Sequence, residues 1–427
     1  MTKDCRPGKR KTYLTIGQDL FSIQEYVTSQ FNYSLHHSSI AKRTSFVPAA
    51  AMAYTDLASL KGLVRPADYG SGVEYASGVI NSIFPNTKIG LQLGLWLNGT
   101  YGCQQIINGE MDQQMNKLHK YLTFTNASAV FLRIGYEFDN PFFGYSDNAT
   151  AYILAFQRIV DYMRNHLNED RLDKTFFVWH SWAAPRAGNL TLEDFYPSDD
   201  YVDWIGVSVF RQVYPWKSNW GNGYVDWGGS VKDIEEVLQF AQKRDKPTMI
   251  AESTPFGGIN MKTADTIKYN ETDPWDRWFG KVLTLIEKYD IDMFSYINCD
   301  WDKQPMWGGV GFGDTRLSTN AEVMDRWFGN IIRSDGNQKF LMGNSICRGE
   351  EEVASPKGSA FAADMPLFIP VILLVISIFI FGKVYTKSKL ESFQTWDDKL
   401  RICRENRRNS VEKWSKYNLR NSWSSVF

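Results

Sequence analysis

Residues 129–181 contain the segments AVFLRIGYE (129–137), ATAYILAFQRIVDYMRNHL (149–167) and TFFVWHS (175–181). The first and last segments are nearly continuous apolar runs, which is typical of parallel strands buried on both faces. The middle segment has apolar residues at every third or fourth position, the spacing of an amphipathic helix. This stretch therefore predicts a strand, a helix and a second, parallel strand.

The same alternation of strand and helix extends over residues 13–345. Another helical pattern occupies 231–244, and further apolar runs predict strands at 12–18, 45–54, 88–97, 203–210, 247–253 and 292–301. Eight strands in about 330 residues give one strand–helix unit per ~40 residues, as a (β/α)8 barrel with loop insertions requires. A doubly wound sheet is the alternative, but GQDLFSIQ after Ile16 lacks the glycine-rich phosphate turn of that fold. The sequence therefore predicts an α/β protein with a (β/α)8 TIM barrel over 13–345, preceded by a short segment, 1–12.

The composition limits the classes of function. Of the 427 residues, 43% are hydrophobic and 22% are charged, which is ordinary for a globular protein and excludes wholesale disorder. The net charge of −1 removes any whole-protein argument for a nucleic-acid partner. The cysteine spacings fit no zinc pattern, so we expect neither a metal site nor a cofactor.

A membrane-spanning helix is predicted at 365–382, because the 18 residues MPLFIPVILLVISIFIFG carry no charge. At 1.5 Å per residue they reach ~27 Å, close to the ~30 Å hydrocarbon core of a bilayer. The following segment, 383–427, carries 11 Lys and Arg against 5 Asp and Glu. This bias predicts a cytoplasmic tail and an outward-facing barrel, which 346–364 link to the single membrane helix.

Six N-glycosylation sequons precede this span and none follows it, which favours the same orientation. They begin at Asn32, Asn98, Asn126, Asn148, Asn189 and Asn270. Cys403 is expected to stay reduced, whereas the cysteines before the span can pair in three ways in an oxidising compartment: Cys5, Cys103, Cys299 and Cys347. Residues 1–17 contain no apolar signal-peptide core, so either the N-terminus is incomplete, which we favour, or the C-terminal span inserts without a signal peptide.

Two carboxylates stand at predicted strand ends, where the active site of a (β/α)8 barrel is built. Glu137 closes the apolar run 129–137, and Glu252 closes the run 247–252. A pair of carboxylates across a barrel mouth suits glycoside hydrolysis, in which one protonates the leaving oxygen and the other attacks the anomeric carbon or activates water. A single Glu at a strand end more often caps a helix or pairs with Arg, but two beside aromatic residues favour the catalytic interpretation.

Aromatic and polar residues at the other strand ends suit the binding of sugar rings, whose C–H faces stack on aromatic side chains. Trp216, Trp220 and Trp307 also fall just beyond strand ends. The expected substrate-binding residues are Arg133, Tyr136, Trp96, His180, Trp182, Tyr214 and Trp301.

The string LRIGYEFDNPFFGY (132–145) resembles the fourth-strand signature of the family 26 β-mannanase group, a branch of the clan of retaining (β/α)8 glycoside hydrolases. That signature has an Arg four residues before a His-Glu pair, then an Asn and an aromatic loop. Arg133 and Glu137 match it in spacing. DWIGVSVF (203–210) and KPTMIAES (246–253) resemble the sixth strand and the nucleophile strand of the family.

This resemblance implies a double-displacement mechanism on a β-linked polysaccharide such as β-mannan. Glu137 would be the general acid/base and Glu252 the nucleophile. Two positions depart from the family pattern, because Tyr136 stands in place of His, and Phe210 in place of an active-site Tyr that Tyr214 would have to supply.

Two other functions remain open. The departures at Tyr136 and Phe210 would suit a tethered carbohydrate-binding or adhesion protein on an inactive glycosidase scaffold. A receptor acting through the basic, aromatic segment 396–423 is a third class, since that segment could lie on an anionic inner leaflet, although a solvated tail explains it equally well. The presence of both Glu137 and Glu252 favours a membrane-anchored hydrolase.

Overall fold

The computed structural model describes residues 5–36, 46–184, 186, 189–214, 229–262, 267–332 and 339–347. Within them, eight parallel strands form a closed barrel, because the last strand pairs with the first, with Tyr13 opposite Met293. In barrel order the strands are β1 (Thr12–Gly17), β2 (Ala50–Asp56), β5 (Gly90–Trp96), β6 (Val130–Ile134), β7 (Thr175–Ser181), β8 (Trp204–Val209), β9 (Thr248–Ser253) and β10 (Met293–Ile297). Each lies within the segment from which it was predicted, or within two residues of it, so the (β/α)8 barrel is confirmed.

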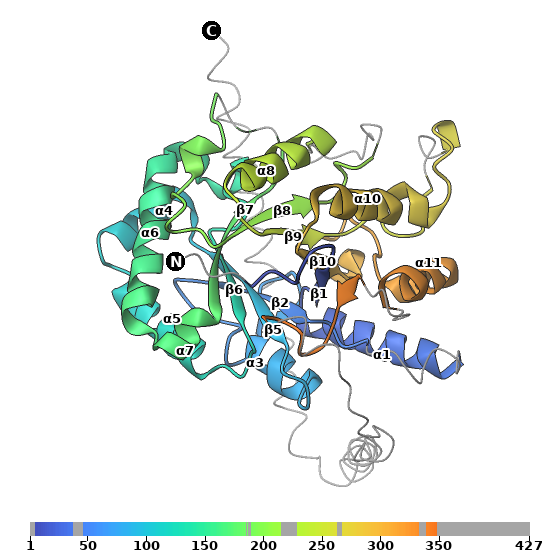
Figure 1. Cartoon of the computed structure of the whole chain (residues 1–427), viewed down its shortest axis with the longest axis horizontal. Coiled ribbons are helices and arrows are strands. Elements are labelled where there is room, and N and C mark those ends of the chain that lie inside the picture. Colours follow the sequence, from blue (N-terminus) through green and yellow to red (C-terminus); the bar gives the residue numbers. More distant parts are fainter. Residues whose placement is uncertain are drawn as a thin grey trace, which may run out of the picture. The chain divides into compact units, whose positions relative to one another are not determined.

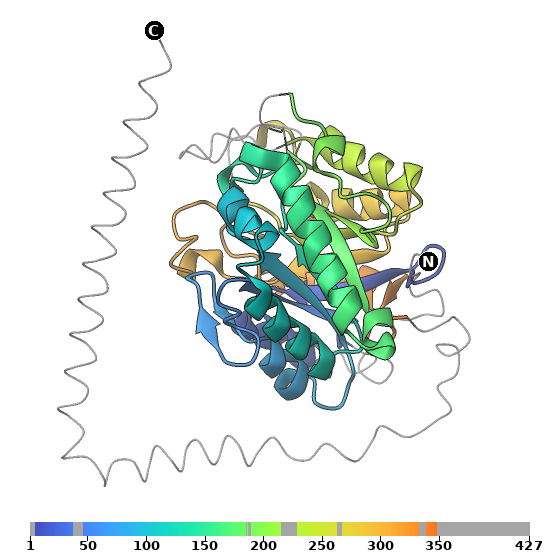
Figure 2. The same cartoon turned by 90° about the vertical axis from the view of Figure 1, so that its left-hand side faces the viewer.

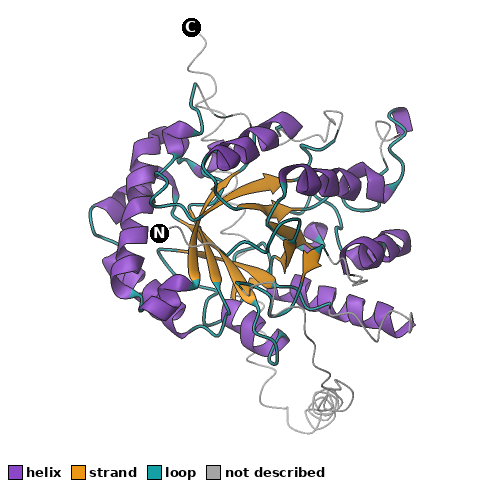
Figure 3. Cartoon of the chain, in the orientation of Figure 1, coloured by secondary structure: helices purple, strands orange, loops and turns teal. Residues whose placement is uncertain are grey.

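Helices surround the strands, as Figures 1 and 3 show. In the described residues they are α1 (Leu20–His36), α3 (Ala76–Gly78), α4 (Gly99–Ile107), α5 (Asp112–Phe124), α6 (Ala149–His166), α7 (Glu169–Asp173), α8 (Val231–Lys243), α10 (Gly280–Tyr289) and α11 (Ala321–Trp327). α5 and α6 lie side by side against the strands (Figure 2). Short strands β3 (Ala67–Asp68) and β4 (Val73–Glu74) form a hairpin after β2, and β11 (Phe340–Leu341) pairs with β1.

The two helices predicted from the sequence form because their N-terminal ends are capped and one face of each is buried. α6 begins where the side chain of Asn148 accepts a hydrogen bond from the backbone N–H of Ala151, and α8 begins at a capping box of Ser230 and Asp233. The apolar stripe of α6 is buried against the barrel, including Tyr152 and Phe156. The predicted helix limits, 149–167 and 231–244, agree with the structure to within one residue.

Alternate residues of the strands pack on opposite sides of the barrel wall. Leu132, Phe177 and Ile250 belong to the large cluster between strands and helices, whereas Phe131 and Met249 belong to a separate cluster inside the barrel. This alternation follows from the two-residue period of a strand. It also determines which strand residues can reach the mouth of the barrel.

A disulfide bond between Cys5 and Cys347 joins the two ends of the described chain, but the second bond that a full pairing of the four cysteines would require does not form. Cys103 and Cys299 are free and buried. Ile346, next to the bond, packs into the interior cluster of the barrel. The compact unit therefore begins before the predicted boundary at residue 13 and continues past the one at 345.

The described residues include no helix that is both long enough and apolar enough to cross a membrane. The span predicted at 365–382 and the basic tail at 383–427 lie outside the described residues, as does the predicted linker apart from Ile346 and Cys347.

Replacing both cysteines of the disulfide, as Cys5→Ser/Cys347→Ser, is expected to lower the free energy of unfolding by about 2–5 kcal/mol. The bond closes a loop with a sequence separation of 342 residues, so its removal restores a large conformational entropy to the unfolded chain. Urea denaturation followed by tryptophan fluorescence measures the change. A reducing agent should destabilise the parent to the same degree and leave the double variant unchanged; equal stability of the oxidised parent and the variant would contradict the prediction.

Candidate active site

A cavity of about 360 Å³ opens at the carboxyl ends of the barrel strands. Each of the eight strands places at least one residue on its wall at or just beyond its end, in barrel order Gln18, Asp56, Trp96, Glu137, Trp182, Phe210, Glu252 and Trp301. Twelve of its 22 lining residues are aromatic, so most of the wall offers flat apolar faces. A volume in this range, with a few convergent polar groups, is typical of a small-molecule or glycan site.

Glu137 reaches the cavity because the chain kinks directly after β6. Gly135 has a φ of +54°, and a Cβ at that position would lie 2.7 Å from the ring of Tyr152, so only glycine fits there. Glu137 itself has a φ of +52°, a left-handed conformation that costs about 1–3 kcal/mol in a residue with a side chain. Backbone hydrogen bonds hold the kink, from Phe138 N–H to the carbonyl of His180 and from Asn140 N–H to the carbonyl of Glu137.

Glu252 reaches the same cavity through an irregularity in the barrel register. Gly206 and Val207 pair with Met249 and Ile250, but the next residue, Ser208, pairs with Glu252 and skips Ala251. Ala251 packs inside the barrel, and strict alternation would therefore turn the side chain of Glu252 outward. The bulge re-aims Glu252 toward the barrel mouth, where it faces Ser208 of the neighbouring strand.

A chain of side-chain contacts joins the two carboxylates beneath the cavity. The guanidinium of Arg133 contacts Oε1 of Glu252, and its Nη1 lies 3.2 Å from Nδ1 of His180. Nε2 of His180 lies 3.0 Å from Oγ of Ser208, which donates a 2.6 Å hydrogen bond to Oε1 of Glu137. Since the Ser208 proton is donated to Glu137, its oxygen accepts from His180, so His180 carries its proton on Nε2 and accepts from Arg133 at Nδ1.

The ionisation of the buried groups agrees with this assignment. Burial, and then the positive charge of Arg133, hold the pKa of His180 well below its usual value, so the ring is neutral. Burial, and then the negative charge of Glu252, raise the pKa of Glu137 to about 8. Hydrogen bonds from Ser208 and Asn140 oppose that rise. Near neutral pH the site thus contains one protonated carboxyl group, Glu137, close to a second carboxyl, Glu252, that contacts a permanent cation.

The structure brings most of the predicted substrate-binding residues to the cavity, but not all of them. Trp96, Tyr136, Trp182 and Trp301 line its wall. Arg133 and His180 are fully buried beneath the cavity and do not line it. Arg133 contacts Glu252, and His180 contacts Ser208, which hydrogen bonds to Glu137.

Tyr214 does not line the cavity, and its hydroxyl donates to the backbone carbonyl of Phe256 at 2.9 Å. It therefore does not supply the hydroxyl missing at Phe210, which does line the cavity. Trp216 and Trp220 lie outside the described residues.

The loop after β10 forms an aromatic wall of Trp301, Trp307 and Phe312. The ring of Trp301 stacks on that of Phe312 with centroids 4.7 Å apart, and its indole N–H donates to Thr315 Oγ1 at 3.1 Å. This wall gives the cavity a rigid apolar side.

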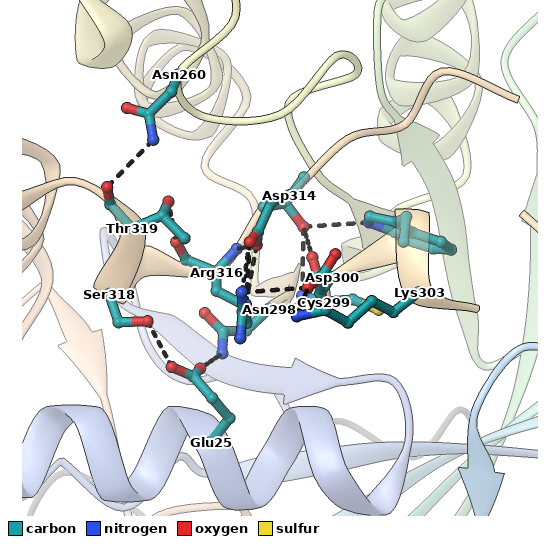
Figure 4. A network of polar contacts seen from close by, with 12 residues as sticks. Glu25, Asn260, Asn298, Cys299, Asp300, Lys303, Asp314, Arg316, Ser318 and Thr319 are labelled. Atoms are coloured by element: carbon teal, nitrogen blue, oxygen red, sulfur yellow. Dashed lines mark hydrogen bonds and ion pairs between the residues drawn. The ribbon is translucent and has the colours of Figure 1, made fainter. Parts of the chain in front are cut away.

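Ion pairs fix the two ends of that loop. Figure 4 shows Asp300, Asp314 and Arg316 pointing toward one another, with the guanidinium of Arg316 2.5 Å from Asp314 and 3.2 Å from Asp300. Lys303 pairs with Asp300 at 2.7 Å, and Glu25 of α1 accepts hydrogen bonds from Asn298 and Ser318. The network thus connects the start and the end of the loop to the barrel.

Ser208 and Asn140 both hydrogen bond to Glu137, and neither is among the site residues expected from the sequence. Both could have been found from the sequence. Ser208 is a polar residue inside the apolar run 203–210, and Asn140 matches the Asn of the fourth-strand signature. Asp139 is another buried carboxyl group at the site that the sequence did not indicate. Burial raises its pKa to about 6. It accepts hydrogen bonds from the hydroxyl of Ser181 and from the backbone N–H of Trp182, and the second bond positions Trp182 at the cavity. In the part of the chain that the structure describes, no group of three or more His, Cys, Asp and Glu is placed to hold a metal ion.

In sequence, the chain is similar to carbohydrate-cleaving enzymes. No protein-family model matches the chain. A β-1,3-xylanase of Alcaligenes sp. is 26% identical over 347 residues, covering 77% of this chain and 64% of that protein. The β-1,3-xylanase TXYA of Vibrio sp. is 27% identical over 333 residues, covering 74% and 63%. The chain thus spans slightly less than two thirds of the length of these relatives; both are glycoside hydrolases, and the resemblance to that class of enzyme is confirmed.

The similar solved structures include mannanases. An endo-β-1,4-mannanase double mutant of Cellulomonas fimi has a TM-score of 0.48 and 13% identity, covering 79% of this chain and 73% of that one. The catalytic domain of a GH26 endo-β-1,4-mannanase of Bacillus sp. JAMB-750 has a TM-score of 0.48 and 14% identity, covering 78% and 88%.

The carboxyl group of Glu137 is expected to titrate near pH 8, and two substitutions should move its pKa in opposite directions. Glu252→Gln removes a neighbouring negative charge and should lower the pKa, whereas Ser208→Ala removes a hydrogen bond to the ionised form and should raise it. Carbon-13 NMR of carboxyl-labelled glutamate measures the titration, with Glu137→Gln assigning the signal. Gln104→Ala on the exposed face of α4 is the control, and a Glu137 pKa near 4.5 in the parent would refute the assignment.

Proposed function

We propose that this chain is a retaining glycoside hydrolase that cleaves β-linked polysaccharide. The observation that carries the proposal is that Glu137 and Glu252 come from different strands into one aromatic-lined cavity and are joined through Arg133, His180 and Ser208. A protonated carboxyl group close to an ionised one is what a double displacement requires.

In the first step, Glu252 attacks the anomeric carbon while Glu137 donates its proton to the leaving glycosidic oxygen. Arg133 contacts Oε1 of Glu252, and within the described residues Oε2 has no hydrogen-bond donor, so Oε2 is the attacking atom. Each oxygen of Glu137 accepts one hydrogen bond and retains a second lone-pair site, so the acidic proton can project into the cavity.

In the second step, a water molecule attacks the covalent glycosyl ester. The water transfers a proton to Glu137, the bond between the anomeric carbon and Glu252 breaks, and both carboxyl groups return to their starting ionisation. Ser208 and Asn140 hydrogen bond to the ionised form of Glu137, and they stabilise it between the two steps. The apolar wall excludes bulk water and strengthens these electrostatic contacts.

The substrate class is a neutral β-glycan. Trp96 and Trp182 are at least partly exposed and offer ring faces on which pyranose rings can stack, and such stacking does not distinguish between sugars. The curated relatives are named as β-1,3-xylanases, and the sequence resembles the β-mannanase group, so β-1,3-xylan and β-mannan are the first substrates to test.

Glu137→Gln and Glu252→Gln are each expected to lower kcat by at least ~100-fold on the cleaved glycan, because each removes a group that acts in the transition state. The measurement uses a panel of β-1,3-xylan, β-mannan, mixed-linkage glucan and cellulose oligosaccharides. Glu322→Gln, at an exposed position of α11, is the matched control and should retain full activity. Proton NMR of the first product should show the same anomer as the substrate; the opposite anomer would overturn the retaining mechanism.

The alternative function is binding of glycan without cleavage. The absence of a tyrosine hydroxyl at Phe210, which Tyr214 does not replace, favours this alternative. If the parent and both Glu variants bind glycan equally well and the parent cleaves none, the protein is a glycan-binding protein and not a hydrolase.

We also propose that the catalytic domain faces away from the cytoplasm and is anchored by the apolar segment 365–382. All six sequon asparagines belong to the described residues and all are exposed, as acceptors of glycans must be. Asn148 is instructive because its Oδ1 caps α6 while its side chain remains exposed.

Expression of the whole chain in cultured animal cells should give a membrane-bound glycoprotein whose mass falls by several glycans on enzymatic deglycosylation. Thr150→Ala removes the sequon at Asn148 without touching the helix cap, so it should remove one glycan and leave stability unchanged. Protease added outside intact cells should digest the barrel and spare a tag at residue 427. Protection of the barrel would exclude this orientation.

A further inference from the structure

The bulge that aims Glu252 at the barrel mouth takes a backbone group out of the regular strand pairing. Ala251 is the residue that the pairing between β8 and β9 skips, so its carbonyl is displaced from that ladder. Ala251 is also fully buried in the interior cluster of the barrel. A buried backbone carbonyl needs a hydrogen-bond donor, and here the donor has to come from another part of the barrel.

Gln92 supplies that donor from the far side of the barrel. Its strand, β5, is four strands away from β9 in either direction around the barrel. Leu91 and Leu93 face the helices, so the side chain of Gln92 between them lies inside the barrel, where it is fully buried. Its Nε2 donates a 2.8 Å hydrogen bond to the carbonyl of Ala251 and lies 3.8 Å from the sulfur of Met249.

The other end of the Gln92 amide is fixed as well. Its Oε1 accepts a 2.8 Å hydrogen bond from the hydroxyl of Ser295 on β10. The reverse orientation of the amide would place its oxygen against the carbonyl of Ala251, which is another acceptor. The side chain is therefore held in one orientation, with its NH2 group toward the bulge.

Beyond the bulge, β9 is joined to β10 by a side chain. In the described chain the register between these two strands ends at Ile250. After that point, Oγ of Ser253 donates a 2.6 Å hydrogen bond to the carbonyl of Ser295. Ser295 thus contacts both Gln92 and the residue that follows Glu252.

Glu252 therefore lies between two anchored positions of β9. The residue before it is held by Gln92, and Ser253 after it is held by Ser295. These three polar side chains are fully buried and uncharged, so the network contains no group that titrates. The contact with Arg133 fixes only the carboxylate end of Glu252, whereas the network fixes the backbone from which its side chain starts.

We propose that Gln92 is a positioning residue for the reaction, because it holds the bulge in β9 and so keeps the carboxylate of Glu252 directed into the cavity. Gln92 does not line the cavity, and it acts through the backbone of Ala251. Its effect on the reaction rests on the proposed function. Its effect on the position of Glu252 does not.

The test variant is Gln92→Met in the full chain, which keeps an unbranched side chain of similar length but loses both hydrogen bonds. A displacement of about 1 Å in a positioned reaction costs about 100-fold, so kcat on the cleaved glycan should fall by roughly 10- to 100-fold. KM should change by less than about twofold, because the residues that line the cavity are all retained.

The pKa of Glu137 reports the position of Glu252 independently of activity. The negative charge of Glu252 raises that pKa, so a carboxylate that turns away from the cavity should lower it. Carbon-13 NMR of carboxyl-labelled glutamate measures the change. A loss of stability that leaves the bulge intact would not move this pKa.

The matched control is Gln30→Met. Gln30 is also fully buried, but it lies on α1, where its amide contacts the sulfur of Met324 at 3.3 Å. This variant should leave kcat and the pKa of Glu137 at their parent values. Parent values in Gln92→Met, or equal changes in both variants, would overturn the inference while leaving the hydrolase intact.

If Gln92→Met does not fold, Ser295→Ala carries the test. It removes the hydroxyl that orients the Gln92 amide, while the backbone carbonyl that accepts from Ser253 remains. One lost hydrogen bond predicts a fall in kcat of roughly 2- to 10-fold and a lower pKa of Glu137. Parent values of both quantities would overturn the inference.

If the parent cleaves no glycan, the proposed function fails, and the pKa of Glu137 alone decides whether Gln92 positions Glu252. A lower pKa in Gln92→Met than in Gln30→Met would support the positioning role. Equal pKa values in the two variants would exclude it.

Discussion

The mouth of this barrel depends on one buried cation, Arg133. Its guanidinium is fully buried, contacts Glu252 and His180, and lies 4.8 Å from the ring centroid of Tyr54 and 5.4 Å from that of Tyr136. A buried charge is stable only when its surroundings compensate it, so Arg133 requires both a carboxylate and aromatic faces nearby. Glu252 therefore has a structural role, as the carboxylate partner of a buried cation, as well as a chemical one.

The two carboxylates differ because their surroundings differ. Glu252 contacts the cation, whereas Glu137 has only the uncharged donors Ser208 and Asn140 and is fully within the apolar wall. Arg133 is also linked to Glu137 through His180: burial and then the charge of Arg133 keep the ring neutral by lowering its pKa, and the contact with Arg133 selects the His180 tautomer that donates to Ser208. A single buried charge thus contacts one carboxylate directly and is linked to the other through His180 and Ser208.

Rigidity at the mouth comes from contacts outside it. The ion pairs of Arg316 with Asp300 and Asp314 hold the aromatic loop after β10, and the contacts of Thr100 with Gly144 hold the loop after β6 against α4. The opposite end of the barrel is closed by Ile346 and by the disulfide that follows it. Loops that are fixed in this way can present stacking faces to a sugar without first losing conformational entropy.

The sequence by itself determined the barrel, because eight apolar runs with helical patterns between them leave few other ways to bury their surface. It also indicated Glu137 and Glu252, since a charged residue at the end of an apolar run can be recognised from the sequence alone. It did not determine that Glu252 faces inward, because alternation from Ala251 points it outward and only the bulge opposite Ser208 reverses this. Nor did it determine the path from Arg133 through His180 and Ser208 to Glu137. It also did not show that Tyr214, expected to bind substrate, lies away from the cavity. Those contacts join residues on different strands, and closure of the barrel in its particular register is what brings them together.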